Sequence, residues 1–285
     1  MGKYTKQIIL ASIVIVAITC VTYADQLEVK LTIPGYKNPY VQGECIPAKI
    51  VIKNADADTA MWQYELGYGV HLFNSEGDTF SDYYPGLFDI HKLPGNSEGY
   101  SRPTISTFRK YHNANCSYFL PPGSYSIYVR IKINDKEGKE KYIDSEKFNF
   151  KVIEPDKNNI NIFRKYCNIW TEHGKRRKKL KEFVNKYPKS IYAPDAYYHW
   201  LVIGQLEIEK SKQVIEYEKL IQNYPDYPKI YWAVDGYARV YDIISKGNDV
   251  CEKIMALNKY SEKAKTSLLK DAIDEWLKKY NQNKI

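Results

Sequence analysis

The sequence lacks the short motifs that mark the common enzyme classes. It contains no GxSxG, HExxH, P-loop or dinucleotide-binding glycine pattern. Its five cysteines are too far apart for CxxC, so thioredoxin-like redox chemistry, zinc knuckles and haem attachment have no support. Histidines and carboxylates between residues 67 and 112 do not occur at tight ligand spacing, and we interpret them as solvated loop residues. We therefore expect a non-catalytic protein without a metal or another cofactor.

Phenylalanine is also scarce, whereas tyrosine is abundant: the chain has 9 Phe and 27 Tyr. Tyrosine packs its ring and keeps its hydroxyl in water, which suits half-buried strands and groove walls. Compositional bias of the source genome is the alternative explanation.

Charge is absent from residues 8–21, which form an apolar run after Lys3 and Lys6. Thr22-Tyr23-Ala24 then provides the small residues that a signal peptidase reads, so we predict a signal peptide over residues 1–24 that is cleaved after Ala24. The predicted location is the periplasm or cell envelope. A retained membrane anchor and lipidation of Cys20 are the alternatives.

Export changes the interpretation of the cysteines that remain after cleavage, which are Cys45, Cys116, Cys167 and Cys251. An even number in an oxidising compartment predicts disulfides. The economical pairing is Cys45–Cys116 with Cys167–Cys251, although the sequence allows three pairings. The alternative is that all four are small buried apolar residues.

The two halves of the chain differ in charge. Residues 25–155 carry 15 Lys and Arg against 17 Asp and Glu, and residues 156–285 carry 25 against 17. This contrast predicts a domain boundary near Pro155, with an all-β domain over 25–155 and an all-α domain over 156–285.

Period-two alternation dominates the first of these domains. Four segments alternate apolar and polar residues as half-buried strands do: 27–33, 48–53, 125–133 and 148–152. Turn sequences such as Pro121-Pro122-Gly123 separate them. The pattern predicts an antiparallel β-sandwich.

Two phrases sharpen that prediction, Val41-Gln42-Gly43-Glu44 and Leu120-Pro121-Pro122-Gly123-Ser124-Tyr125. With them the segment resembles the immunoglobulin-like sandwich domains of exported bacterial proteins, including those similar to the intracellular proteinase-inhibitor fold. No inhibitory activity follows from the resemblance. Cys45, Trp62 and Cys116 approximate the Cys, Trp and Cys spacing of antibody domains, which suggests one bridge between the sheets.

The periodicity becomes helical from Asn158 onward. Apolar residues at helical spacing predict helices ending near Gly174, over 175–186, from Pro194, from Ser211, over 230–245, after Asp249 and over 266–280. Asp249, with Glu252 three residues later, predicts a capping box at the start of the sixth of these helices. The pairs Tyr187-Pro188 and Tyr224-Pro225 lie 37 positions apart. A period of this size is typical of stacked helical hairpins, which usually bind other proteins.

Residues 190–225 carry a more specific pattern: Ser190, Tyr192, Ala193, Ala196, Tyr198, Tyr217, Tyr224 and Pro225. Here the chain resembles the tetratricopeptide repeats of bacterial envelope proteins, such as the Tol-Pal-associated cell-division coordinator and the outer-membrane assembly lipoproteins. The resemblance covers roughly residues 158–260 and implies a short helical solenoid. Leu201 and Glu209-Lys210 depart from the pattern, which puts the standard peptide groove in doubt.

The strongest charge feature is the run Lys175, Arg176, Arg177, Lys178 and Lys179. Together with Tyr198 of the repeat, these are the candidate partner-binding residues. An acidic protein partner or a membrane surface fits such a run, and export argues against nucleic acid. The alternative is a solvated helix coated by long basic side chains.

These observations predict an exported, non-catalytic adaptor or scaffold that binds a protein partner through its helical repeats. The alternative function is a carbohydrate- or peptidoglycan-binding β-sandwich with a helical spacer, in which a sheet face would present an aromatic platform of Trp62, Tyr64, Tyr68, Tyr83 and Tyr84. A proteinase inhibitor that acts through sandwich loops is a third hypothesis, which rests on fold analogy only.

Overall fold

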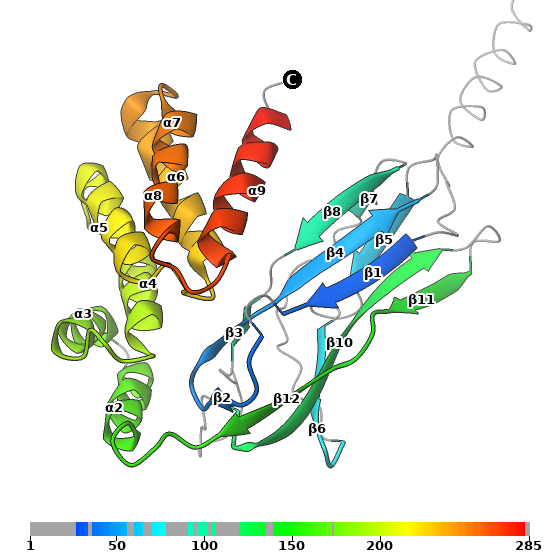
Figure 1. The fold of residues 1–285 in the computed structure, drawn as a ribbon, viewed down its shortest axis with the longest axis horizontal. Coiled ribbons are helices and arrows are strands. Elements are labelled where there is room, and N and C mark those ends of the chain that lie inside the picture. Colours follow the sequence, from blue (N-terminus) through cyan, green and yellow to red (C-terminus); the bar gives the residue numbers. More distant parts are fainter. Residues whose placement is uncertain are drawn as a thin grey trace, which may run out of the picture. The chain divides into compact units, whose positions relative to one another are not determined.

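The computed structural model describes residues 27–33, 36–55, 60–64, 70–77, 91–93, 96–101, 104–106, 120–134, 139–172 and 174–282. Strands occupy the N-terminal half and helices the C-terminal half, which confirms the predicted order of β before α (Figure 1). The chain divides into two compact units. The first comprises Met1–Leu31, Ile50–Ser101 and Ser126–Asn149, and the second comprises Thr32–Lys49, Arg102–Tyr125 and Phe150–Ile285.

The first unit consists of strands. One sheet has the order β1-β4-β8, with β4 and β8 antiparallel. In the other, β10 pairs antiparallel with β11 and β5, β5 pairs antiparallel with β7, and β6 also pairs with β10. The strands are β1 (Leu27–Thr32), β4 (Lys49–Asn54), β5 (Ala60–Tyr64), β6 (Val70–Asn74), β7 (His91–Leu93), β8 (Ser97–Ser101), β10 (Gly123–Asn134) and β11 (Glu140–Asp144).

The core of this unit follows the alternation in the sequence. Ile127, Val129, Ile131 and Ile133 of β10 are buried, and the residues between them are half-exposed, as a strand with one covered face requires. Val129, Ile131 and Ile133 form a cluster with apolar residues of β1 and β4. The predicted strand over 125–133 is therefore confirmed.

The second unit begins with short strands. β2 (Tyr40–Val41) runs parallel to β12 (Phe148–Ile153), with Tyr40 opposite Val152, and β3 (Cys45–Pro47) runs antiparallel to β9 (Thr104–Ser106). The ring of Tyr40 is buried and meets Phe150 edge-on, with 6.0 Å between the ring centroids. The segment between β2 and β3 is thereby held at both ends.

Helices make up the rest of this unit. They are α2 (Ile160–Thr171), α3 (Arg176–Lys186), α4 (Ala193–Ile203), α5 (Lys210–Asn223), α6 (Ile230–Ser245), α7 (Val250–Ala256), α8 (Asn258–Ser261) and α9 (Leu268–Gln282). From α2 to α7 each helix packs against the next along the chain, and α9 packs against α6, α7 and α8. The predicted helices are all present, and α8 is an additional short one.

Small residues allow the helices to approach closely. Ala196, Ala233 and Ala238 are fully buried. Gly236 of α6 faces the ring of Tyr217 on α5, so closely that a Cβ atom at position 236 would lie 2.6 Å from Tyr217 Cζ. The packed side chains of α2–α9 form one continuous apolar core.

Candidate functional site

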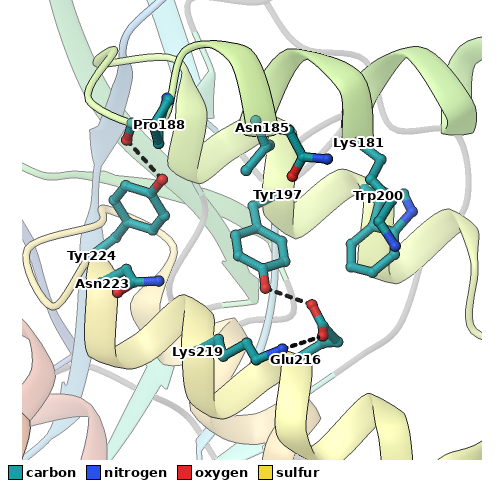
Figure 2. A pocket seen from close by; sticks show the side chains of 10 residues that line it. Lys181, Asn185, Pro188, Tyr197, Trp200, Glu216, Lys219, Asn223 and Tyr224 are labelled. Carbon is teal, nitrogen blue, oxygen red and sulfur yellow. Dashed lines mark hydrogen bonds and ion pairs between the residues drawn. The ribbon is translucent and has the colours of Figure 1, made fainter.

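A cavity of about 500 Å³ lies between α3, α4 and α5 (Figure 2). Helix α3 and the turn after it supply one wall, α4 supplies the aromatic floor, and α5 supplies the opposite wall. The lining residues are Lys181, Val184, Asn185, Pro188, Tyr197, Trp200, Glu216, Lys219, Asn223 and Tyr224.

The floor is formed by Tyr197 and Trp200, which lie three positions apart and therefore share one face of α4. Their ring centroids are 5.7 Å apart. Trp200 keeps only 6% of its surface exposed and Tyr197 only 8%. Both rings are thus core residues whose edges reach the cavity.

The carboxylate of Glu216 in the cavity is already paired with donors from the chain itself. The Tyr197 hydroxyl donates to Glu216 Oε2 over 2.6 Å, and Lys219 Nζ donates to Glu216 Oε1 over 2.7 Å. Burial alone would raise the pKa of Glu216, but the hydrogen bonds from Lys219 and Tyr197 hold it below its usual value. Burial and this same carboxylate raise the pKa of Tyr197. Glu216 is therefore ionised and paired at neutral pH.

The other charged group of the cavity is Lys181. Its ammonium nitrogen lies 4.5 Å from the ring centroid of Trp200, within range of a cation–π interaction. The side chain is otherwise exposed. With Lys181 and Lys219 facing one carboxylate, the lining carries a net charge of +1.

The two Tyr-Pro pairs meet at one end of the cavity. The hydroxyl of Tyr224, from the second pair, donates to the carbonyl of Pro188, from the first, over 2.8 Å. Figure 2 shows this bond beside the cavity. The repeated phrase therefore links consecutive hairpins directly.

A second polar group, the Asp195 cluster, is buried beneath the other side of α4. Three side chains donate to Asp195 Oδ1: Cys45 over 3.1 Å, Tyr227 over 2.7 Å and Lys229 over 2.7 Å. The Tyr166 hydroxyl donates to Oδ2, and His199 Nε2 lies 3.5 Å from the same oxygen. The Asp195 cluster consists of Cys45, Tyr166, Asp195, His199, Tyr227 and Lys229.

The charges of the Asp195 cluster cancel. Burial alone would raise the pKa of Asp195, but the ammonium of Lys229 and then His199 hold it well below its usual range. Burial lowers the pKa of His199 to about 4 and raises the pKa of the Cys45 thiol. At neutral pH the imidazole is uncharged and the thiol keeps its proton, so Cys45 is not an activated nucleophile.

Cys45 belongs to a segment of the chain that lies on α2 and α4. The hydroxyl of Tyr192 donates to the Gln42 carbonyl over 3.0 Å. Gly43 has φ +84°, and a Cβ atom there would lie 2.7 Å from Phe163 Cε2. Residues 42–45 therefore cover this face of the helices with the chain's own backbone.

Most of the predicted partner-binding residues have intramolecular partners. Arg176 donates to the carbonyl of Trp170 and stacks on its ring, and Arg177 and Lys179 pair with Glu207 and Glu172. The remaining three are placed as follows: Lys175 and Lys178 are exposed, Lys178 lies 3.9 Å from Glu182, and Tyr198 is half-buried against Tyr227. None of these six lines the cavity.

The cysteines differ from the predicted pairing. Cys45, Cys167 and Cys251 are free thiols. Cys167 lies on α2 and Cys251 on α7, and because these helices stack in chain order, the intervening hairpins separate the two thiols. The predicted Cys167–Cys251 disulfide is thus absent. Because Cys45 is a free thiol, the predicted Cys45–Cys116 disulfide is not formed either, although Cys116 itself lies outside the described residues.

Other sequence-based candidates remain untested. The signal segment with Ala24 and Cys20 lies outside the described residues, and so do Tyr68, Tyr83, Tyr84 and His112. Trp62 lies in β5, opposite Ile133 in the register. Within the described part of the chain, no group of His, Cys, Asp or Glu side chains could hold a metal ion, and no helix is long and apolar enough to span a bilayer.

Sequence reasoning overlooked the polar walls of the cavity. Lys181 and Asn185 are four positions apart on α3, and Glu216, Lys219 and Asn223 are spaced by three and four on α5. Each set shares one helix face, which the 3.6-residue period could have indicated. The sequence does not show that these two faces meet across α4, because this depends on the order in which the helices pack.

No family model matches the chain, and no curated protein matches it. Solved structures show partial similarity. The ASH/PapD-like domain of human CEP192 is 13% identical, with 49% of this chain and 93% of that chain covered and a TM-score of 0.30. The C-terminal domain of wzt is 7% identical, with 47% and 82% covered and a TM-score of 0.29. A β-glucosidase from Listeria innocua in complex with gluconolactone is 14% identical, with 45% and 16% covered and a TM-score of 0.26.

Proposed function

We propose that the chain is an exported, non-catalytic adaptor that binds a protein partner in the periplasm or cell envelope through its helical unit. The proposal includes the finer fold: an immunoglobulin-like sandwich followed by a short tetratricopeptide-like solenoid. Sequential packing of α2–α7 and the hydrogen bond from Tyr224 to Pro188 support the repeat interpretation. The signal peptide predicted over residues 1–24 supports export.

The observation that carries the proposal is the contrast between two faces of α4. Residues 42–45 cover one face, and the polar groups on that face form hydrogen bonds within the chain. The other borders the 500 Å³ cavity, whose walls carry exposed Lys181, Asn185 and Asn223. These three side chains are exposed in the part of the chain that the structure describes, so we propose this second face as the binding surface.

The Asp195 cluster supports a structural rather than a catalytic role for the buried polar groups. Catalytic acids, bases and nucleophiles need access to substrate and a pKa matched to the reaction. Here the thiol is protonated, the imidazole is neutral and the carboxylate is saturated with donors.

Site-specific photocrosslinking in the native cell tests the proposal. A photoreactive amino acid at position 185, on the cavity wall, is compared with one at position 141, on exposed β11 of the first unit. We expect position 185 to crosslink to a specific envelope protein that mass spectrometry identifies and that position 141 does not capture. The adaptor proposal fails if position 185 yields no specific adduct, or the same adducts as position 141.

A further inference from the structure

We propose that the cavity between α3, α4 and α5 binds a carboxylate of an acidic peptide segment in the protein partner. This inference rests on the proposed function, because it assigns the chemistry by which the partner is recognised. The side chains that carry it are Lys181 and Asn185 of α3 and Asn223 of α5.

The first argument is charge. Glu216 is already paired, since Lys219 and the Tyr197 hydroxyl both donate to it. Within the described residues, Lys181 forms no ion pair with a carboxylate; its ammonium lies over the ring of Trp200 instead. An ammonium group has three donors, so the outer side of Lys181 remains available to an anion.

The second argument is hydrogen bonding. Asn185 and Asn223 extend from opposite walls of the cavity, as Figure 2 shows. Neither amide donates a hydrogen bond within the part of the chain that the structure describes, and both residues are exposed. Each amide provides two N–H donors for carboxylate oxygens. Charge-assisted bonds of this kind are about twice as strong as neutral ones.

The third argument separates a peptide from a glycan. Sugars stack on the exposed face of an aromatic ring, but Trp200 and Tyr197 are more than nine-tenths buried. Lys181 also covers the Trp200 ring. No open aromatic platform exists on this floor. Pro188, exposed, and Tyr224, half-exposed, instead provide apolar contact for a side chain next to the acidic residue.

The experiment begins with a random peptide library selected against the full chain. Enriched peptides are labelled with fluorescein, and their affinities are measured by fluorescence anisotropy. For each peptide, a second version in which Asp or Glu is replaced by Asn or Gln is measured in the same way. The variant is Lys181→Glu. Lys212→Glu is the matched control, because Lys212 lies on α5, another helix of the cavity, is 71% exposed and does not line the cavity.

We expect the enriched peptides to share an acidic residue next to an apolar one. Lys181→Glu should weaken their binding by about tenfold or more, and Lys212→Glu should leave it unchanged. A peptide in which Lys replaces the acidic residue should bind Lys181→Glu better than it binds the unaltered chain. This reversal would distinguish a direct contact from a loss of folding.

Three results would overturn the inference. Peptides that bind equally well to Lys181→Glu would place recognition elsewhere, while the adaptor function would still stand on the crosslinking result. If peptides bind equally well after their acidic residue is replaced, the group that the cavity recognises is not a carboxylate. In the third case, solubilised cell-wall glycan binds in a Lys181-dependent manner and peptides do not bind. The ligand would then be a sugar acid instead of a peptide.

Discussion

Asp195 joins several segments of the chain through one buried carboxylate. Its donors come from β3, α2, the α5–α6 connection and Lys229 at the start of α6. Removing one partner of a buried ion pair leaves the other charge uncompensated, which costs about 3–5 kcal/mol. Loss of either member of the buried pair of Asp195 and Lys229 should therefore destabilise the helical unit, and Cys45 connects residues 42–45 to the same carboxylate.

The same cluster predicts a pH dependence of stability. The pKa of His199 falls to about 4 in the folded state, from an ordinary value of about 6.5, so the unfolded chain binds the proton more readily. Stability should therefore decrease as the pH falls from about 7 to 4. The His199 side chain is 28% exposed, and solvent relaxes part of the penalty, so we expect a loss of about 1–2 kcal/mol from this group.

Urea unfolding at several pH values between 7 and 4 measures this effect. The groups near His199 are Asp195, Lys229, Arg176 and the rings of Trp170 and Tyr198. The Asp195 carboxylate, the Lys229 ammonium and the Tyr198 hydroxyl do not change their charge in that range. The variant His199→Gln should show a shallower fall in stability than the unaltered chain. Identical slopes in the two proteins would show that His199 makes no contribution.

At the scale of elements, helices α5 and α6 approach each other closely where Gly236 of α6 meets Tyr217 of α5. Replacing glycine by alanine inside a helix ordinarily stabilises it by about 1 kcal/mol. Here the new methyl group would lie 2.6 Å from a ring that is only 1% exposed, and overpacking costs about 1–3 kcal/mol. We expect Gly236→Ala to lower the melting temperature, as calorimetry or circular dichroism would show.

A second substitution tests the cause. Tyr217→Leu removes the ring atoms that the new methyl group would meet. Adding Gly236→Ala to this background should cost less stability than adding it to the unaltered chain, because the two positions are coupled. Equal costs in both backgrounds would exclude the clash as the cause.

Much of the element level follows from sequence. The alternation in β10 and the helical spacing after Asn158 arise because one face of each element is covered. The strand and the helices that these two patterns predict are both present. The predicted capping box at Asp249 is wrong, because Asp249 adopts φ +55° and its side chain makes no cap hydrogen bond. Local residue types suggest such a cap, but the turn through Lys246 and Gly247 sets the backbone there.

The sites were less predictable because they depend on distant contacts. Cys45 and Asp195 are 150 positions apart, and no local pattern relates them. The basic run of α3 was prominent in the sequence, yet Arg177 and Lys179 are paired with nearby carboxylates in the fold. Lys181, the lysine that we propose as a ligand contact, follows that run in the sequence. Only the fold shows that its ammonium group lies over the ring of Trp200 on α4.

At the scale of the whole molecule, location decides which partners the cavity can meet. The positively charged and then apolar segment before Ala24 predicts cleavage by signal peptidase. Expressed in a bacterium with a periplasm, the mature chain should begin at Asp25, and the intact mass should correspond to residues 25–285. The free thiols of Cys167 and Cys251 should then accept alkylating reagent without prior reduction.

Two variants separate cleavage from its alternatives. A large charged residue at the cleavage position, as in Ala24→Arg, should block processing and leave the precursor on the membrane, because the peptidase reads small residues there. Cys20→Ser should leave processing and mass unchanged. If Cys20→Ser instead abolishes incorporation of labelled palmitate, Cys20 is a lipid anchor. In that case the cavity would work at a membrane surface, and its acidic partner should be sought among proteins of the same membrane.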